Sequence, residues 1–165
     1  MVDMGHKMDA SIIAAFSHAA TSTFRDMFGL EATESDSREL QPSEDHGWDL
    51  TGLVGLAGQA HGVIAIRLTQ SLIAGLLAGS GVTAGGDDER RQLEGGLVGE
   101  MTNIIAGSAI SAIRGIDMEI APPVVVRGPN HKIGWPSIAP VVAIGFSLPG
   151  GGASGGFEVD LCIRV

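Results

Sequence analysis

Cysteine and aromatic residues are both scarce in this chain of 165 residues. The sequence holds one cysteine, Cys162, and aromatic residues make up 4% of it. A single cysteine excludes an internal disulfide and fits a reducing compartment. Cys162 lies in the apolar run LCIRV, which favours a packed small side chain over a nucleophile. With so few aromatic side chains, we expect an aliphatic core in a chain long enough to form one.

Basic residues and long apolar runs are also few. Ten Lys and Arg stand against 19 Asp and Glu, for a net charge of −9. No basic patch is dense enough for binding to a nucleic-acid backbone. Arg67, Glu100 or Asn103 interrupts the most apolar windows, and the N-terminus lacks the pattern of a signal peptide. We therefore expect a cytoplasmic protein with no nucleic-acid or membrane partner.

Several catalytic signatures are incomplete in this sequence. The five histidines show no metal-ligand spacing with one another or with the cysteine, so we expect no metal of the protein's own. Gly79–Gly86 is glycine-rich but lacks the Lys-Ser/Thr of a phosphate loop. The G-x-S-x-G match at Gly152–Gly156 precedes a strand rather than a helix, which argues against a serine hydrolase. His131 is either a surface or hydrogen-bonded histidine or a catalytic base.

The pattern of the chain predicts helices and strands in an α+β order. We expect one domain spanning 1–165, with a mostly antiparallel sheet packed against two long helices. Residues 31–46 are acidic and predict a mobile loop or an edge strand. Each half offers a long helix followed by two strands, although no sequence repeat is evident. The expected helices are 9–28, 70–78 and 87–115, and the expected strands are 48–56, 59–68 (a hairpin turning at Ala57-Gly58), 118–127, 131–135, 138–148 and 157–165.

The long helix predicted over Asp87–Gly115 is the element around which the other predicted helices and strands are arranged. Acidic residues at its start and Arg114-Gly115 at its end are typical helix boundaries. Its predicted core stripe contains Leu97, Met101, Ile104, Ser108 and Ala112. Glu100 and Asn103 are predicted to lie off this stripe, as neighbours on the open face.

Glycines surround this pair, although each costs about 1 kcal/mol relative to alanine inside a helix. Close packing against another element is one explanation, particularly for Gly95 and Gly107. The other is clearance: Gly96, Gly99 and Gly107 would let the backbone of a partner protein approach Glu100 and Asn103.

The run GLVGEMTNIIAGSA resembles the long-helix segment of the CheC–CheX–FliY family of response-regulator phosphatases. The hairpin DLTGLVGLAGQAHGVIAIRL and the later runs VVVRGPNHKI and VVAIGFSL also resemble members of the CheX type. The resemblance covers roughly residues 8–165. It implies a CheC-like fold and a site of the form E-x-x-N, here Glu100 and Asn103.

The resemblance implies hydrolysis of the aspartyl phosphate on a CheY-like receiver in chemotaxis or another two-component system. The receiver would hold Mg2+ and a lysine beside its acyl phosphate, so this chain needs no cofactor of its own. Asn103 would align the attacking water, and Glu100 would pair with the lysine of the receiver. One E-x-x-N site in the chain implies a CheX-like homodimer joined through its sheets. We expect the dimer to cover the long edges of the apolar strands VVAIGFSL and FEVDLCIRV.

Two positions depart from the family pattern. Gly96 stands where the family usually has an acidic residue or serine, and Ile110 where it often has a lysine or similar polar residue. Gly96 keeps open the alternative of a non-catalytic module of the same fold that binds a receiver. A small-molecule-binding domain is a third possibility, for which the sequence shows no convergent polar cluster.

Overall fold

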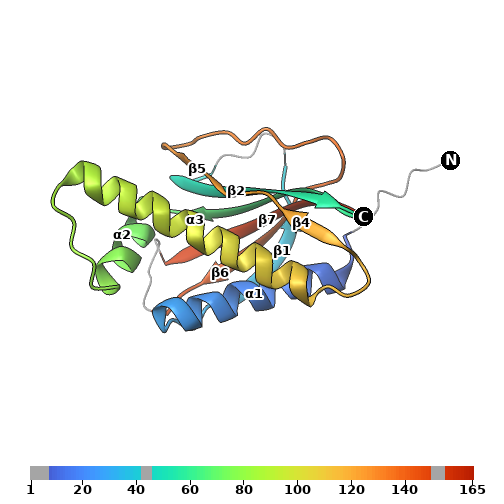
Figure 1. Cartoon of the computed structure of the whole chain (residues 1–165), viewed down its shortest axis with the longest axis horizontal. Helices are drawn as coiled ribbons and strands as arrows, with labels where there is room; N and C mark the ends of the chain where they lie inside the picture. Colours follow the sequence, from blue (N-terminus) through green and yellow to red (C-terminus); the bar gives the residue numbers. More distant parts are fainter. Residues whose placement is uncertain (1–7, 42–45, 150–154) are drawn as a thin grey trace.

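Two long helices lie side by side on one face of an antiparallel sheet (Figure 1). The computed structural model describes residues 8–41, 46–149 and 155–165. The first helix, α1, spans Ala10–Phe28. The side chain of Asp9 accepts a hydrogen bond from the backbone N–H of Ser11 at its start, and Gly29 ends it with φ of 65°. The helix predicted over 9–28 is confirmed.

Seven strands form one sheet in the described part of the chain. Their spatial order is β1-β6-β7-β3-β2-β4, and β5 pairs with β2 beside β4. Every pairing is antiparallel, as expected from the sequence. The strands are β1 (Thr33–Glu39), β2 (Leu50–Gly58), β3 (His61–Leu68), β4 (Met118–Ile120), β5 (Val124–Arg127), β6 (Val142–Ser147) and β7 (Gly156–Arg164).

The sheet has an internal pseudo-two-fold arrangement about its central pair, β3 and β7. On one side β3 is followed by β2 and then by β4 and β5, and on the other β7 is followed by β6 and then by β1. The first strand of each half therefore pairs with a strand of the other half. The second long helix, α3 (Asp87–Ala112), takes the place in its half that α1 takes in the first. This arrangement agrees with the helix-and-two-strands pattern of each half of the sequence.

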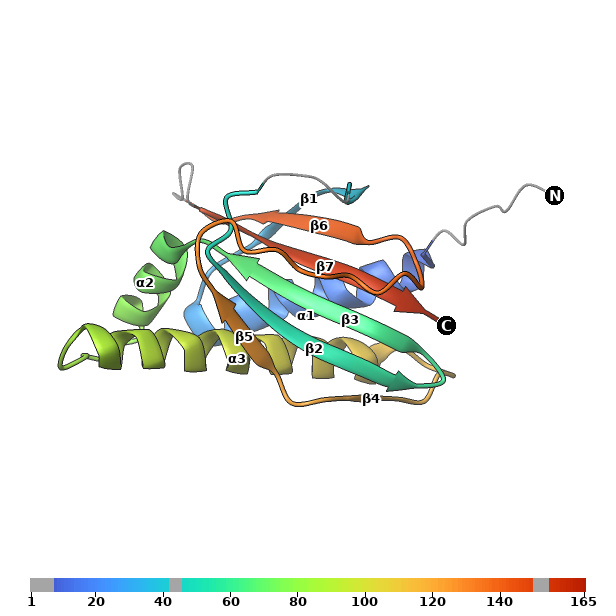
Figure 2. The same cartoon turned by 90° about the horizontal axis from the view of Figure 1, so that it is seen from above.

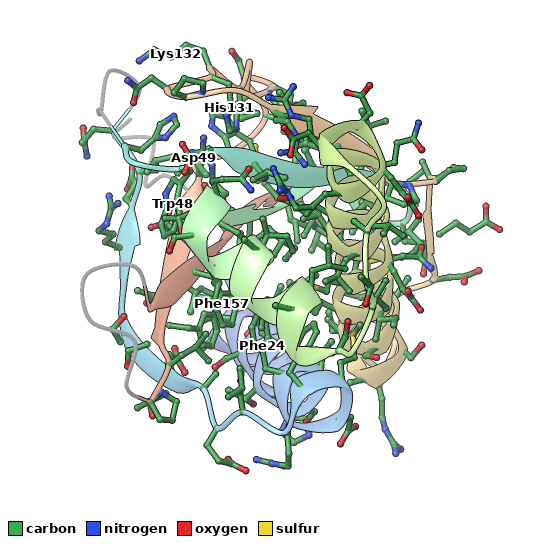
Figure 3. The ribbon with its side chains drawn as sticks, turned by 90° about the vertical axis from the view of Figure 1, so that its left-hand side faces the viewer. Phe24, Trp48, Asp49, His131, Lys132 and Phe157 are labelled. Atoms are coloured by element: carbon green, nitrogen blue, oxygen red, sulfur yellow. The ribbon has the colours of Figure 1, made fainter. Side chains whose placement is uncertain are left out.

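The core between helices and sheet contains a stack of three phenylalanine rings. Phe24 of α1 stacks on Phe157 of β7 with ring centroids 4.0 Å apart. Both residues are labelled in Figure 3. Phe157 stacks in turn on Phe146 of β6 at 4.7 Å. The rest of this core is mainly aliphatic, as the composition predicts. The stack joins α1 to the C-terminal strands and holds the helix on the sheet.

The short helix α2 spans Gln70–Gly79 and connects β3 to the start of α3. Thr69 accepts from the N–H of Leu72, and Asp49 accepts from the N–H of Gln70 at 2.8 Å. The helix predicted over 70–78 is confirmed, and Asp49 is a second cap contributed from a distant position in the sequence.

Four predictions about the strands are wrong or need adjustment. Residues 131–135 form no strand; they belong to a segment that covers the outer face of the sheet, where Pro136 and Ala139 contact Cys162. The hairpin turns at Gln59-Ala60, two residues later than expected. Residues 33–39 form an edge strand rather than a mobile loop, and residues 42–45 lie outside the described part. Both edges of β6 and β7 are paired, so the two strands offer no free edge to a dimer.

Candidate functional site

The orientation of α3 differs from the predicted one, although its position along the chain is nearly as expected. Met101 is buried, but Ile104, Ser108 and Ala112 are exposed. The reason is that the buried face includes a polar and a charged residue, while an isoleucine lies on the outside, so the apolar pattern is weak. The buried residues are Glu94, Val98, Gly99, Met101, Thr102, Ile105, Ala106 and Ala109.

Glu100 and Asn103 lie together on the side of α3 turned away from the sheet. Both are exposed, and their spacing of three residues makes their side chains neighbours on one helical face. Neither forms a hydrogen bond or ion pair with any other described residue. We define the exposed face of α3 as the exposed residues Gly96, Glu100, Asn103 and Ile104 together with the half-buried Gly107. This face presents an acceptor and an amide that the fold itself does not use.

The three glycines predicted to contact a partner have different surroundings. A Cβ added at Gly96 would meet nothing within 4 Å, and Gly96 is exposed beside Glu100. A Cβ at Gly107 would lie 3.9 Å from Cδ1 of Ile120. The placement of Gly99 on the open face is wrong: it is buried, with Pro123 and Val125 within 4 Å of such a Cβ. Gly99 therefore belongs to the packing of α3 against β5 and the residues before it.

The exposed face of α3 is convex, which suits a protein partner better than a small molecule. A cavity of about 1070 Å³ lies instead where the N-terminal end of α1 meets the C-terminal end of α3. Ile12, Ile113 and Ile163 are among its lining residues, while Glu100 and Asn103 are not. The site of the predicted chemistry is therefore an open surface.

A buried charged cluster on the other face of the sheet escaped the sequence analysis. Arg67 of β3 lies 3.6 Å from Asp160 of β7. Glu158 is two residues before Asp160, so the side chains of both lie on the same face of β7. Burial raises the pKa of Asp160 to about 9, and the neighbouring carboxyl group of Glu158 adds to the rise. The raised pKa of Asp160 favours its protonated form at neutral pH, opposite Arg67.

Other candidates from the sequence have structural surroundings. His131 contacts the hydroxyl of Thr51 and the carbonyl of Gly128, which favours the hydrogen-bonded histidine over the catalytic base. Cys162 is buried, and burial raises the pKa of its thiol. No group of metal-binding side chains occurs among the residues that the structure describes. The serine of the G-x-S-x-G match lies outside the described residues.

Comparison with known proteins gives one consistent result. The family model described as chemotaxis phosphatase CheX matches residues 50–147, a range that includes Glu100 and Asn103. A search of curated proteins gives no match. Among the described residues, no helix is long and apolar enough to cross a membrane.

Solved structures from three bacteria are similar over nearly the whole chain. The chemotaxis protein CheX from Desulfovibrio desulfuricans is 26% identical, with a TM-score of 0.79 over 93% of this chain and 99% of that one. CheX from Vibrio vulnificus is also 26% identical, with a TM-score of 0.79 over 94% and 100%. A CheX-CheY-BeF3-Mg2+ complex from Borrelia burgdorferi gives 25% identity and a TM-score of 0.78 over 96% and 100%.

Proposed function

Because the chain belongs to the CheX family of chemotaxis phosphatases, we propose that Glu100 and Asn103 are the residues through which it hydrolyses the aspartyl phosphate of a CheY-like receiver. The observation that carries this assignment is the exposed face of α3. On it, an acid and an amide stand side by side with no partner in the described chain. Gly96 adds no side chain beside them, so a receiver can approach the helix closely.

The chemistry is divided between the two proteins. The receiver contributes Mg2+ and a lysine, which stabilise the charge of the transferred phosphoryl group. The amide of Asn103 accepts a hydrogen bond from a water molecule and donates one to it, and so aligns the water with the phosphorus atom. Glu100 forms a charge-assisted hydrogen bond with the lysine of the receiver and fixes the register of docking. The chain needs no cofactor of its own in this scheme, and a receiver partner fits a cytoplasmic location.

A homodimer is part of the proposal, and the sheet suggests where the two copies meet. One free edge is β1, whose sequence TESDSRE carries the charges that typically prevent strand pairing. The other edge includes β5, with the sequence VVVR, and Val124 in it is 60% exposed. We infer that two copies join through the β5 edge. Both sheet edges would then be protected, one by charge and the other by the second copy.

The experiment that tests the function is phosphate release from a phosphorylated receiver, with and without this protein. Asn103→Ala is expected to leave docking almost unchanged, because the water contact matters mainly in the transition state. Loss of one positioned hydrogen-bonding group lowers the rate by about 10²–10³ in comparable sites. The measurement is the single-turnover rate with the receiver saturated.

Two results would contradict this assignment. A rate for Asn103→Ala equal to that of the wild type would remove Asn103 from the mechanism. A wild-type protein that binds the receiver without accelerating phosphate loss would instead support the non-catalytic module. Gly96, in the place of an acidic residue or serine, is the sequence feature that motivates this second possibility.

A further inference from the structure

Glu94 is a buried carboxylate in a part of α3 that is otherwise exposed. The residue is 0% exposed, whereas all six residues from Asp87 to Gln92 at the start of the helix are exposed. An ionised carboxylate is costly to bury unless charged groups and hydrogen bonds compensate for the lost water. The partners of Glu94 therefore have to account for its position.

Three elements meet at this carboxylate. Arg127 of β5 lies 3.7 Å from Oε2, and Arg90 of α3 lies 3.4 Å from Oε1. The side-chain amide of Gln70, the first residue of α2, donates a hydrogen bond to Oε2. We call Gln70, Glu94 and Arg127 the Glu94 clamp.

Arg127 reinforces the clamp from the strand. Its guanidinium donates to Oε1 of Gln70 at 2.8 Å and to the backbone carbonyl of Arg91 at 3.2 Å. Figure 2 shows β5 lying next to α3. The N-terminal part of the helix extends past β5 and beyond the sheet. The strand thus holds both a side chain and the backbone of the helix.

The same strand contacts α3 a second time near the functional residues. Val125 and Pro123 lie within 4 Å of a Cβ built at Gly99, the residue before Glu100. Between the two contacts, a Cβ added at Gly95 or at Gly96 would meet no atom within 4 Å. The charged contact at residue 94 and the packing at residue 99 therefore join α3 to β5 at two points along the helix.

Stability alone does not require a charged clamp. A buried ion pair is generally no more stabilising than well-packed apolar residues of similar volume, but it does demand one geometry. Glu94 precedes Glu100 by six residues, about 9 Å along the helix, so a change at the clamp moves the functional residues directly. We propose that Glu94 is a positioning residue, which holds Glu100 and Asn103 at the depth and angle that the receiver requires. This inference rests on the proposed function.

The test uses Glu94→Gln, which keeps the size of the side chain and removes its charge. The single-turnover rate with saturating phosphorylated receiver is expected to fall about 10- to 100-fold, the loss that a misplacement of about 1 Å produces. Asp88→Asn, which removes an exposed charge from the same helix, is the control and should keep the wild-type rate. Arg127→Lys breaks the clamp from the strand side and should lower the rate as Glu94→Gln does. It also provides the test if Glu94→Gln does not fold.

A double mutant separates positioning from general stability. If Glu94 acts through Asn103, then Glu94→Gln should lower the rate little further in the Asn103→Ala background. A merely structural role would lower the melting temperature but leave the rate per folded molecule unchanged, and that result would overturn the inference. If Asn103→Ala lowers the single-turnover rate while folded Glu94→Gln keeps the wild-type rate, the positioning role is refuted and the proposed function stands. A fully active Asn103→Ala refutes both.

Discussion

Glu100 illustrates how a single side chain can matter for a partner and hardly at all for the fold. It is exposed and has no partner among the described residues, so its loss should change the free energy of unfolding by less than about 0.5 kcal/mol. Removing one side of a desolvated interfacial charge pair typically costs about 2–5 kcal/mol of binding. We therefore predict that Glu100→Ala weakens receiver binding by that amount at an unchanged melting temperature.

The measurement is the dissociation constant of the receiver complex together with a thermal melt. Asp88→Ala removes an exposed carboxylate from the first turn of the same helix, away from the residues that define the exposed face of α3. It should leave the affinity unchanged. If Glu100→Ala instead keeps its affinity and melts at a lower temperature, Glu100 is a structural residue.

Asp160 makes a prediction about pH. Its pKa is raised to about 9 by burial first and by Glu158 second, although Arg67 and Arg38 oppose the rise. The folded protein therefore keeps a proton that the unfolded chain releases near pH 4. Since the folded state binds more protons than the unfolded state, the free energy of unfolding falls as pH rises from about 4 to about 9.

Asp160→Asn has a neutral side chain in both states and should remove this pH dependence. The melting temperature of the variant, relative to that of the wild type, should rise between pH 5 and pH 8.5. Asp26→Asn, at an exposed position of α1, serves as the control and should show no such trend. Parallel pH profiles for wild type and Asp160→Asn would mean that Asp160 is ionised in the folded protein.

The sequence contains part of the signal for this cluster. Glu158 and Asp160 alternate in FEVDLCIRV, so their side chains share one face of the strand. Their partner Arg67 is on β3, and this pairing depends on a sheet topology that local patterns do not reveal. Glu94 was missed for a similar reason, because Gln70 and Arg127 come from distant parts of the sequence. Glu100 and Asn103 were predictable because both lie within one turn of a single helix.

At the scale of elements, α3 shows what helical periodicity can and cannot predict. The existence of the helix and its start were correct, but its orientation was not, because Thr102 is buried while Ile104 is exposed. Thr102 lies against Gly52 of β2, where an added Cβ would collide with its hydroxyl. A glycine in a strand thus makes room for a polar residue of a helix, and no pattern within the helix alone indicates this.

The glycines of α3 give a prediction at the same scale. Gly96→Ala should stabilise the helix by up to about 1 kcal/mol, since the new methyl group meets nothing within 4 Å. If Gly96 provides clearance for a partner, the same substitution should weaken receiver binding. Gly95→Ala has equally free surroundings but lies outside the exposed face of α3, so it should raise the stability and keep the affinity. Equal affinities for the two variants would contradict the clearance role.

For the whole molecule, the free edges of the sheet predict its assembly. Wild-type protein should be a dimer at micromolar concentration by light scattering, because the β5 edge is apolar and unpaired within the described chain. Val124→Lys places a charge on this edge at an exposed position and should give a monomer of unchanged fold. A monomeric wild-type protein, or a dimeric Val124→Lys, would refute the assembly through β5.

The fold at this scale was largely predictable from the sequence, apart from the order of its strands. The helices, the hairpin and the antiparallel pairing follow from local patterns and turn residues. The exchange of first strands between the halves does not, because the pairings of β1 with β6 and of β4 with β2 join segments that are far apart in the sequence. For this reason the predicted free edges of β6 and β7 were wrong.

The central position of β7 has a consequence for how the protein is made. Among the described strands β7 comes last in the sequence, yet it lies in the middle of the sheet beside β3 (Figure 2). During synthesis from the N-terminus, β3 leaves the ribosome long before β7, so the edge of β3 that pairs with β7 stays open in the meantime. Contacts between such distant segments also slow folding. During this period the unpaired edge of β3 can pair with strands of other chains. The same edge is the segment that a chaperone would bind.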